Sequence, residues 1–168
     1  MSDLQVVRLV PWAEGDLALL RRINTPEMKR YVGGPETDEQ VEARHRRYLA
    51  LGTGQMFRVE LVASGDAAGT IGHWEREWHG ERVYETGWSV LPEFQGRGVA
   101  VAAARALIEV VRAEGRHRWL HAYPGVDNTA SNAICRRAGF ELVGETEFEY
   151  PPGSLMRSHD WRYDLRGA

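Results

Sequence analysis

The sequence predicts a single α+β domain with a mixed, mostly antiparallel sheet of six to seven strands and about four helices. The chain has 168 residues, the usual length of one domain. Strand pairs typical of antiparallel hairpins occur in the first half of the chain, and a strand–helix–strand crossover follows over residues 82–123. A crossover among hairpins gives a mixed sheet with helices on its faces. No internal repeat or linker divides the chain, so we expect one domain over residues 1–168.

Periodic patterns justify the elements of the first half. Apolar–polar alternation predicts strands, and one-face spacing predicts helices. Thr37 and Gln40 have the spacing of a capping box, which starts a helix, and Gly52 would end it. The expected elements are strand 6–11, helix 13–23, the helix between the capping box and Gly52, strand 57–61, and strands 70–78 and 82–90 joined around His79–Glu81.

The second half changes from hairpins to a crossover. An apolar stripe between Ala100 and Val111, with charged residues on the other face, predicts a long helix. Residues 119–123 then predict a short strand. Asn128 is suited to cap a further helix that Gly139 would end. Two closing strands are expected over 141–150 and 156–165.

Composition and charge exclude several classes of protein. Hydrophobic residues make up 43% of the chain and aromatic residues 10%, which is enough to bury a core and excludes general disorder. With a net charge of −3, a broad basic surface for nucleic acid is not expected. The longest apolar run, 99–104, is too short to span a membrane, and residues 1–5 lack the pattern of a secretory signal. We therefore expect a cytoplasmic location.

Cysteine and histidine usage gives no sign of a metal site. Cys135 is the only cysteine, so neither an intrachain disulfide nor a multi-cysteine zinc site can form, and a reducing compartment is expected. The histidines are scattered without an acidic partner at an obvious ligand spacing. They are His45, His73, His79, His117, His121 and His159. We expect no metal.

The segment between the strand ending at Val90 and the long helix is the most informative about function. Gly96 and Gly98 lie there, and glycine permits positive φ angles and a close approach of backbone to ligand. Free amides at the start of a helix suit a phosphate or pyrophosphate. On the glycines alone, a turn that binds nothing explains the pattern equally well.

Two common nucleotide motifs do not fit this segment. A dinucleotide fingerprint needs a third small residue in register and an acidic residue about 20 positions on, at the next strand end. That strand ends at His121–Tyr123, with no acid. A P-loop needs Gly-Lys-Ser or Gly-Lys-Thr, and the sequence has neither triplet.

A third interpretation fits better. Gln95-x-x-Gly98-x-Ala100 resembles the acyl-CoA pyrophosphate loop of the GNAT N-acetyltransferase superfamily, and Glu85–Pro92 resembles that family's fourth strand. The stretch from Asn128 to Phe140 resembles its second half, where an asparagine starts a helix that ends in Gly-Phe. The resemblance covers roughly residues 82–145. It is closest to the branch that contains ribosomal-protein alanine N-acetyltransferases and many small-amine acetyltransferases.

The resemblance implies acetyl-CoA as the co-substrate. Backbone amides of residues 96–101 would hold the pyrophosphate, residues 88–90 would bond the pantetheine arm through their backbone, and an amide near Val90 would stabilise the oxyanion. A bulge would splay the fourth strand from the fifth to admit the thioester. Asn128 would reach the pantetheine arm, or only cap its helix. The implied donor-site residues are Trp88, Ser89, Val90, Gln95, Gly96, Arg97, Gly98, Val99, Ala100, Val101, Asn128 and Cys135.

The implied reaction is direct attack of a primary amine on the thioester, which needs a base because the amine is mostly protonated at neutral pH. Glu85 occupies the family position for that base. His121 lies where some relatives carry a glutamate on the fifth strand, and histidine titrates in the right range. A solvated strand glutamate and a structural histidine are the alternatives for these two residues.

The leaving thiolate also needs a proton donor. Cys135 lies seven residues after Asn128, where many relatives carry a tyrosine. A small buried residue is the favoured role for this cysteine. Tyr123, Tyr150 or solvent could supply the proton instead.

The acceptor site is expected from the first two helices, the hairpin at His79 and the loop between the last two strands. Aromatic and acidic residues there would suit a cationic amine, although the glutamates at 145, 147 and 149 also fit a half-exposed strand. His45 and Tyr48 would face either the slot or the core. The residues of interest are Trp12, Trp74, Trp78, Glu75, Glu77, Glu81, Glu145, Glu147 and Glu149.

Three functions are compatible with these features. If the chain is an enzyme, it acetylates either a small amine or a protein N-terminus. The alternative from another class is a non-catalytic module that binds acyl-CoA. The lack of a tyrosine at position 135 favours the binding module slightly, whereas Glu85 and the intact glycine loop favour the enzyme. Members of the family are often dimers, so the resemblance allows a homodimer, although no residue indicates one.

Overall fold

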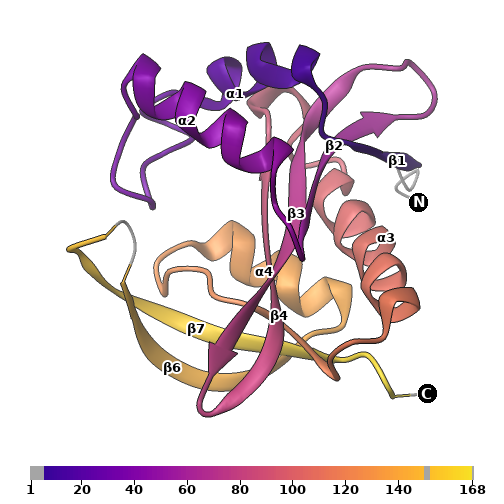
Figure 1. Cartoon of the computed structure of the whole chain (residues 1–168), viewed down its shortest axis with the longest axis vertical. Helices are drawn as coiled ribbons and strands as arrows, with labels where there is room; N and C mark the ends of the chain where they lie inside the picture. The colour runs from indigo at the N-terminus through magenta and orange to yellow at the C-terminus, as the bar shows by residue number, and fades with distance from the viewer. Residues whose placement is uncertain (1–5, 150–151, 168) are drawn as a thin grey trace.

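The computed structural model describes residues 6–149 and 152–167, and seven strands of this part of the chain form one sheet (Figure 1). The strand order is β1-β2-β3-β4-β5-β7-β6, and every neighbouring pair is antiparallel except β4 and β5. The strands are β1 (Val7–Pro11), β2 (Gln55–Leu61), β3 (Ala67–Trp78), β4 (Glu81–Val90), β5 (Trp119–Ala122), β6 (Glu141–Glu149) and β7 (Leu155–Asp164). The predicted α+β class is confirmed. Tyr150, which we placed at the end of a strand, lies outside the described residues.

Local signals set the helix ends. The capping box forms as predicted, because Thr37 Oγ1 accepts from Gln40 N at 3.2 Å and Gln40 Oε1 accepts from Thr37 N at 2.8 Å. The helix predicted over 13–23 instead begins as a 3₁₀ turn, where the Asp16 carboxylate accepts from the amide of Ala13 at 2.9 Å. The helices are α1 (Leu17–Ile23), α2 (Asp38–Leu49), α3 (Val99–Glu114) and α4 (Thr129–Ala138), with 3₁₀ turns η1 (Glu14–Asp16) and η2 (Pro92–Phe94). No helix of the described residues is both long and apolar enough to cross a membrane.

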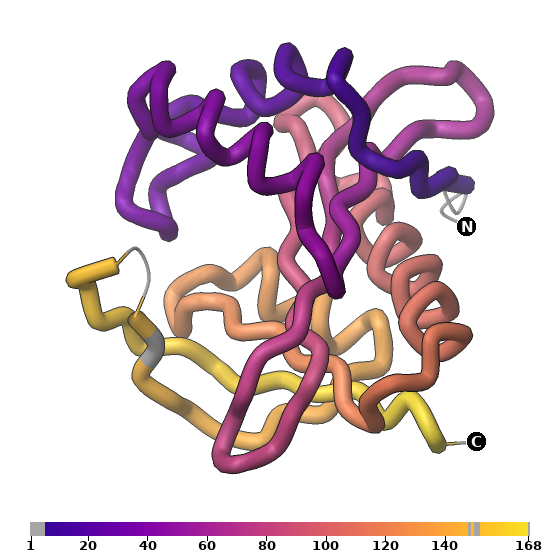
Figure 2. The backbone as a smooth tube through the Cα atoms, viewed as in Figure 1, coloured from indigo at the N-terminus to yellow at the C-terminus, as the bar shows by residue number. Residues whose placement is uncertain are grey.

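Helices cover the sheet from both sides. Helix α3 lies on one side of the central strands β3 and β4, and α1 and α2 lie on the other (Figures 1 and 2). The larger core cluster joins α3 and α4 to the sheet and includes Ile71, Tyr84 and Leu120. The smaller cluster, around Leu20 and Val41, joins α1 and α2 to the opposite face. Because cross-strand partners share a face, each strand divides its side chains between these two layers.

Strands β4 and β5 separate soon after they meet. Their parallel pairing consists of Tyr84 with Leu120 and Glu85 with His121, after which β4 continues to Val90 without β5 beside it. This confirms the splayed strand pair that the resemblance implied. The register between β3 and β4 runs without a shift along its whole length, so the bulge that we expected in β4 does not interrupt that side of the strand. The separation therefore leaves one edge of β4 open beside the site.

Candidate active site

The loop before α3 has the backbone that its glycines predict. Gly96 and Gly98 have φ angles of 74° and 77°, in the left-handed region that favours glycine. A Cβ atom at either position would meet no atom within 4 Å, so the requirement is one of backbone conformation rather than of space. Gly98 also precedes the first turn of a 16-residue helix. The first turn of α3 leaves backbone amides without intrahelical acceptors at the positive end of the helix dipole, an arrangement suited to an anion.

Two side chains fix the shape of this loop. Gln95 Nε2 donates to the carbonyl oxygen of Val90 at 2.8 Å, which ties the loop to the end of β4. The exposed guanidinium of Arg97 lies 5.8 Å from the ring centroid of Phe94. Gln95 is thus a brace for the loop, while Arg97 adds positive charge to its surface.

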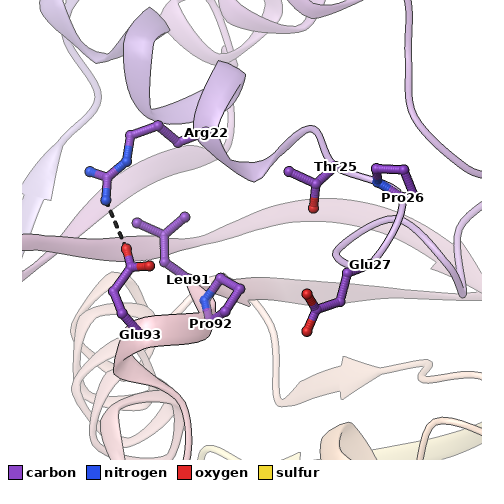
Figure 3. Close-up of a pocket in the computed structure, with 7 residues that line it drawn as sticks. All are labelled: Arg22, Thr25, Pro26, Glu27, Leu91, Pro92 and Glu93. Carbon is purple, nitrogen blue, oxygen red and sulfur yellow. Dashed lines mark hydrogen bonds and ion pairs between the residues drawn. The ribbon is translucent and has the colours of Figure 1, made fainter.

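A groove adjoins the same loop on the side of α1. It has a volume of about 540 Å³ and lies between the end of α1 and the turn η2 (Figure 3). Its walls are Arg22, Thr25, Pro26, Glu27, Leu91, Pro92 and Glu93. Arg22 Nη2 contacts Glu93 Oε1 at 2.8 Å across it. Leu91, Pro92 and Glu93 on its wall come from the segment that leads into the loop before α3.

The open edge of β4 consists of the residues that we expected to bind the pantetheine arm. Trp88, Ser89 and Val90 pair with β3 on one side, and no strand of the described residues pairs with them on the other. Gly69 pairs with Val90, and a Cβ atom on Gly69 would overlap the Ser89 carbonyl oxygen, so only glycine permits this approach of β3 to β4. The unpaired edge can accept an extended ligand as an added strand.

Helix α4 begins at Asn128, as predicted, and its side chain serves as the cap. Asn128 Oδ1 accepts from the backbone amide of Ser131 at 3.1 Å. The neighbouring Asn132, which the sequence did not single out, is buried and joins α4 to β7. Its Oδ1 accepts from Trp161 Nε1 at 2.8 Å and contacts His159 Nδ1 at 2.7 Å. No local pattern distinguishes such an asparagine from an ordinary helical one.

Cys135 lies in the core between α4 and the sheet, fully buried. Burial raises the pKa of its thiol to about 12. A thiol that is so weakly acidic and so far from solvent fits the packing role that we favoured from the sequence.

Glu85 lies on the face of β4 opposite α3, because its neighbour Tyr84 points into the core beneath that helix. Arg76 Nη1 donates to Glu85 Oε1 at 2.8 Å. Burial raises the pKa of Glu85, and the charges of Arg76 and His121 oppose that rise. The carboxylate is therefore held in a partly desolvated position rather than on a solvated strand.

His121 lies beside Glu85 and has a buried acidic partner. Its Nδ1 contacts Asp160 Oδ1 on β7 at 2.6 Å, and both side chains are buried. Trp78 Nε1 donates to the other oxygen of Asp160 at 3.0 Å. Sequence reasoning named His121 but missed Asp160, which lies 39 positions away and carries no local signal.

Aromatic side chains surround Glu85, His121 and their partners. The Arg76 guanidinium lies 5.0 Å from the ring centroid of Trp78 and 5.2 Å from that of Tyr123. The Tyr123 ring stacks on His121 with a centroid distance of 5.6 Å. Burial raises the pKa of the Tyr123 hydroxyl above its usual value. The ion pair of Glu85 with Arg76 and the hydrogen-bonded pair of His121 with Asp160 thus lie beside aromatic rings where β4 and β5 separate.

The model of the acetyltransferase (GNAT) domain family matches residues 7–141. The chain belongs to this family. Two curated relatives, L-methionine sulfoximine/L-methionine sulfone acetyltransferases of Pseudomonas paraeruginosa and Pseudomonas aeruginosa, are each 39% identical over 92 residues, which are 51% of this chain and 52% of the relative. The chain therefore spans about half the length of the curated relatives that it matches.

Solved GNAT structures share the whole fold. A GNAT-family acetyltransferase from Bacillus anthracis superimposes with a TM-score of 0.80 at 18% identity, with 98% of each chain covered. RimL, a ribosomal L7/L12 alpha-N-protein acetyltransferase in complex with coenzyme A, has a TM-score of 0.78 at 20% identity, with 98% of this chain and 96% of that chain covered. At these identities the likeness shows the fold.

Several residues that we assigned to the acceptor region lie elsewhere in this GNAT fold. Trp12 and His45 are buried together under α2, where Trp12 Nε1 donates to His45 Nδ1 at 3.0 Å, so His45 faces the core. Glu75 lies on the α3 face and contacts Arg116 at 2.8 Å and His117 at 2.9 Å. Glu75 therefore lies on the other side of the sheet from Glu85 and His121.

Two glutamates of β6, Glu145 and Glu147, also point away from Asp160. Glu145 pairs in register with His159, and Glu147 with Arg157, on the face opposite Asp160. Both glutamates are exposed, which agrees with the half-exposed strand that we weighed against an acceptor role. Among residues 6–149 and 152–167, no three potential ligand side chains gather in a way that could hold a metal ion.

Proposed function

We propose that this GNAT protein transfers the acetyl group of acetyl-CoA to the primary amine of a small molecule. One observation carries the proposal: β4 and β5 separate directly after Glu85 and His121, so the two side chains suited to activate an amine lie where a thioester would enter between the strands. The nearby glycine loop and helix terminus supply an anion site for the other end of the donor.

The donor would lie along β4. The amides of residues 96–101 would bind the pyrophosphate, and Gln95 and Arg97 would support and extend that site. The open edge at residues 88–90 would bond the pantetheine arm, with Asn128 available from the start of α4. The CoA found with RimL is consistent with this donor class for the fold.

The reaction would proceed by direct transfer. The amine nitrogen attacks the thioester carbon, an amide near Val90 stabilises the oxyanion, and the carbon–sulfur bond breaks to release the CoA thiolate. The amine loses a proton to a base, for which Glu85 and His121 are both in place. Tyr123 or solvent would return a proton to the thiolate, because Cys135 is buried in the core.

A small acceptor is favoured over a protein N-terminus by the surroundings of these groups. Trp78, Tyr123 and Arg76 pack against one another around Glu85 and His121, whereas a peptide needs an open groove at this point. The curated relatives are named for small amino-acid analogues, which agrees with the same acceptor class. Acceptors should accordingly be compact amines.

The test is release of CoA from acetyl-CoA by the purified chain. The acceptor panel contains amino acids and L-methionine sulfoximine, polyamines, aminoglycosides and peptides with free N-termini. Turnover with at least one compact amine, confirmed by mass spectrometry of the acetylated product, would support the proposal. Turnover with peptides alone would assign the protein N-terminus instead, and CoA binding without any transfer would favour a non-catalytic acyl-CoA-binding module.

A further inference from the structure

The buried contact between His121 and Asp160 constrains which nitrogen of the imidazole carries a proton. The Asp160 carboxylate accepts from Trp78 Nε1 on one oxygen at 3.0 Å, and its other oxygen lies 2.6 Å from His121 Nδ1. A carboxylate only accepts hydrogen bonds, so Nδ1 must donate. In the neutral ring the lone pair then lies on Nε2, to which no described residue bonds.

Strand geometry holds this contact in place. β5 lies between β4 and β7, so His121 has Glu85 in register on one side and Arg162 on the other. Asp160 is two residues before Arg162 on the same face of β7. Because both partners come from paired strands in the middle of the sheet, the ring cannot turn away without breaking a buried hydrogen bond.

We propose that Asp160 is a positioning residue that makes His121 Nε2 the proton acceptor for the amine. This rests on the acetyltransferase function proposed above. As the amine nitrogen bonds to the thioester carbon, its proton passes to Nε2, and the electron pair of the carbon–sulfur bond leaves with the CoA thiolate. Asp160 keeps the proton on Nδ1 and faces the imidazolium that forms. Glu85, paired with Arg76, would then attract the amine rather than take its proton.

Substitution of Asp160 by asparagine separates positioning from packing. The new amide side chain would have one acceptor oxygen for two donors, Trp78 Nε1 and His121 Nδ1. If its amide nitrogen faces the histidine, Nδ1 must accept, and the proton moves to Nε2. We expect Asp160→Asn to shift the His121 tautomer toward Nε2 protonation with almost no change in side-chain volume.

The first experiment reads the tautomer directly and needs no acetyltransferase activity. Long-range ¹H–¹⁵N spectra of histidine-labelled protein identify which ring nitrogen is protonated. We expect the neutral ring of His121 to carry its proton on Nδ1 in the parent and on Nε2, at least in part, in Asp160→Asn. A parent ring protonated on Nε2 would overturn the proposal, whether or not any acceptor has been found.

The second experiment uses the acceptor found in the panel. We expect Asp160→Asn to lower kcat/KM for the amine on the order of 100-fold, with acetyl-CoA affinity unchanged. His121→Gln should lose at least as much, and the double variant should be no slower than His121→Gln, since Asp160 acts through His121. The matched control is Asp164→Asn on the same strand, whose carboxylate pairs with Arg118 at the surface.

These outcomes separate the two proposals. If the parent transfers acetyl groups and Asp160→Asn is as fast as Asp164→Asn, the positioning role is wrong while the acetyltransferase function stands. Losses that add in the double variant would also contradict it, because they would show that Asp160 acts independently of His121. If the parent transfers nothing, the spectra alone decide the state of the ring.

Discussion

Glu85 and His121 are the last residues that pair β4 with β5, and their side chains lie on the face opposite α3. Glu85 has a basic partner and His121 an acidic one, since Arg76 donates to Glu85 at 2.8 Å and Asp160 contacts His121 at 2.6 Å. The two strands separate at the point where these pairs meet. A thioester entering between the strands would therefore meet a carboxylate and an imidazole that are already oriented.

Substitution of Glu85 by glutamine tests the first of these partners. The change keeps the shape of the side chain but removes the charge that pairs with Arg76 and that would attract an amine. We expect kcat/KM for the amine to fall about tenfold or more, while the dissociation constant of acetyl-CoA stays the same. Steady-state kinetics and calorimetry measure the two quantities separately.

Glu109→Gln is the control for this prediction, because Glu109 is exposed on α3, which lies on the opposite side of the sheet from the Glu85 side chain. It should leave both quantities unchanged. A parent rate for Glu85→Gln would remove Glu85 from the proposed chemistry. Equal losses of amine turnover and of acetyl-CoA affinity would instead assign it to donor binding.

How far the sequence predicts this site depends on how local each signal is. Gly98, Asn128 and the capping box at Thr37 act within a few residues, so their patterns can be recognised along the chain. Asp160 acquires its role only when β7 pairs with β5. That pairing depends on the order of strands in the sheet, which residue patterns do not encode. The aspartate therefore looks like any polar residue of a half-exposed strand.

The positions of the glutamates near the expected acceptor side depend on similar long-range information. The glutamates of the third and sixth strands are close in sequence to the expected slot, but which face they occupy depends on register. Glu75 falls on the α3 face with Arg116, and Glu147 falls opposite Asp160. The sequence alone therefore could not decide which of these glutamates share a face with Glu85 and His121.

Replacement of Gly98 by valine should abolish binding of the donor. The φ angle of 77° at this position disfavours a β-branched side chain, so the loop must change conformation and move its amides. We expect CoA affinity measured by calorimetry to fall at least tenfold, about 1.4 kcal/mol. The circular dichroism spectrum should remain that of the parent, because the core beneath α3 is untouched.

Gly65→Val is a matched control for this change. Gly65 has a φ angle of 76° and lies in the turn between β2 and β3, with open space around its missing Cβ. Both variants carry the same kind of backbone strain, roughly 1–2 kcal/mol, but only Gly98→Val places that strain in the glycine loop before α3. If Gly98→Val binds CoA as tightly as Gly65→Val does, the pyrophosphate assignment is wrong.

The link between Glu36 and α2 should make stability depend on pH. Arg44 donates two hydrogen bonds of 2.8 Å to the Glu36 carboxylate, and these hold the pKa of Glu36 below its usual value. Because the pKa of Glu36 is lower in the folded state, the pair with Arg44 stabilises the fold at pH values above the ordinary pKa of glutamate. That contribution is lost as the pH falls through the folded-state value.

Glu36→Gln isolates this effect. We expect the variant to be less stable than the parent near neutral pH, and the difference in unfolding free energy to shrink as the pH falls below the ordinary range of glutamate. Urea unfolding at a series of pH values measures it. A difference that stays constant with pH would show that the Glu36 charge contributes nothing, and that the glutamine acts through packing alone.

Replacement of Cys135 by alanine tests whether this thiol has any part in the chemistry. The side chain is fully buried in the core, where burial raises its pKa to about 12. We therefore expect the single-turnover rate of acetyl transfer to match the parent. The cavity left by the sulfur should reduce the unfolding free energy by roughly 1–2 kcal/mol.

Cys135→Ser is the informative companion to the alanine variant, because it keeps a proton donor but buries a hydroxyl in apolar surroundings. A packing role makes the serine variant the less stable of the two, with both enzymes equally fast. A proton-donor role would make the alanine variant slow in the chemical step and leave the serine variant the faster enzyme.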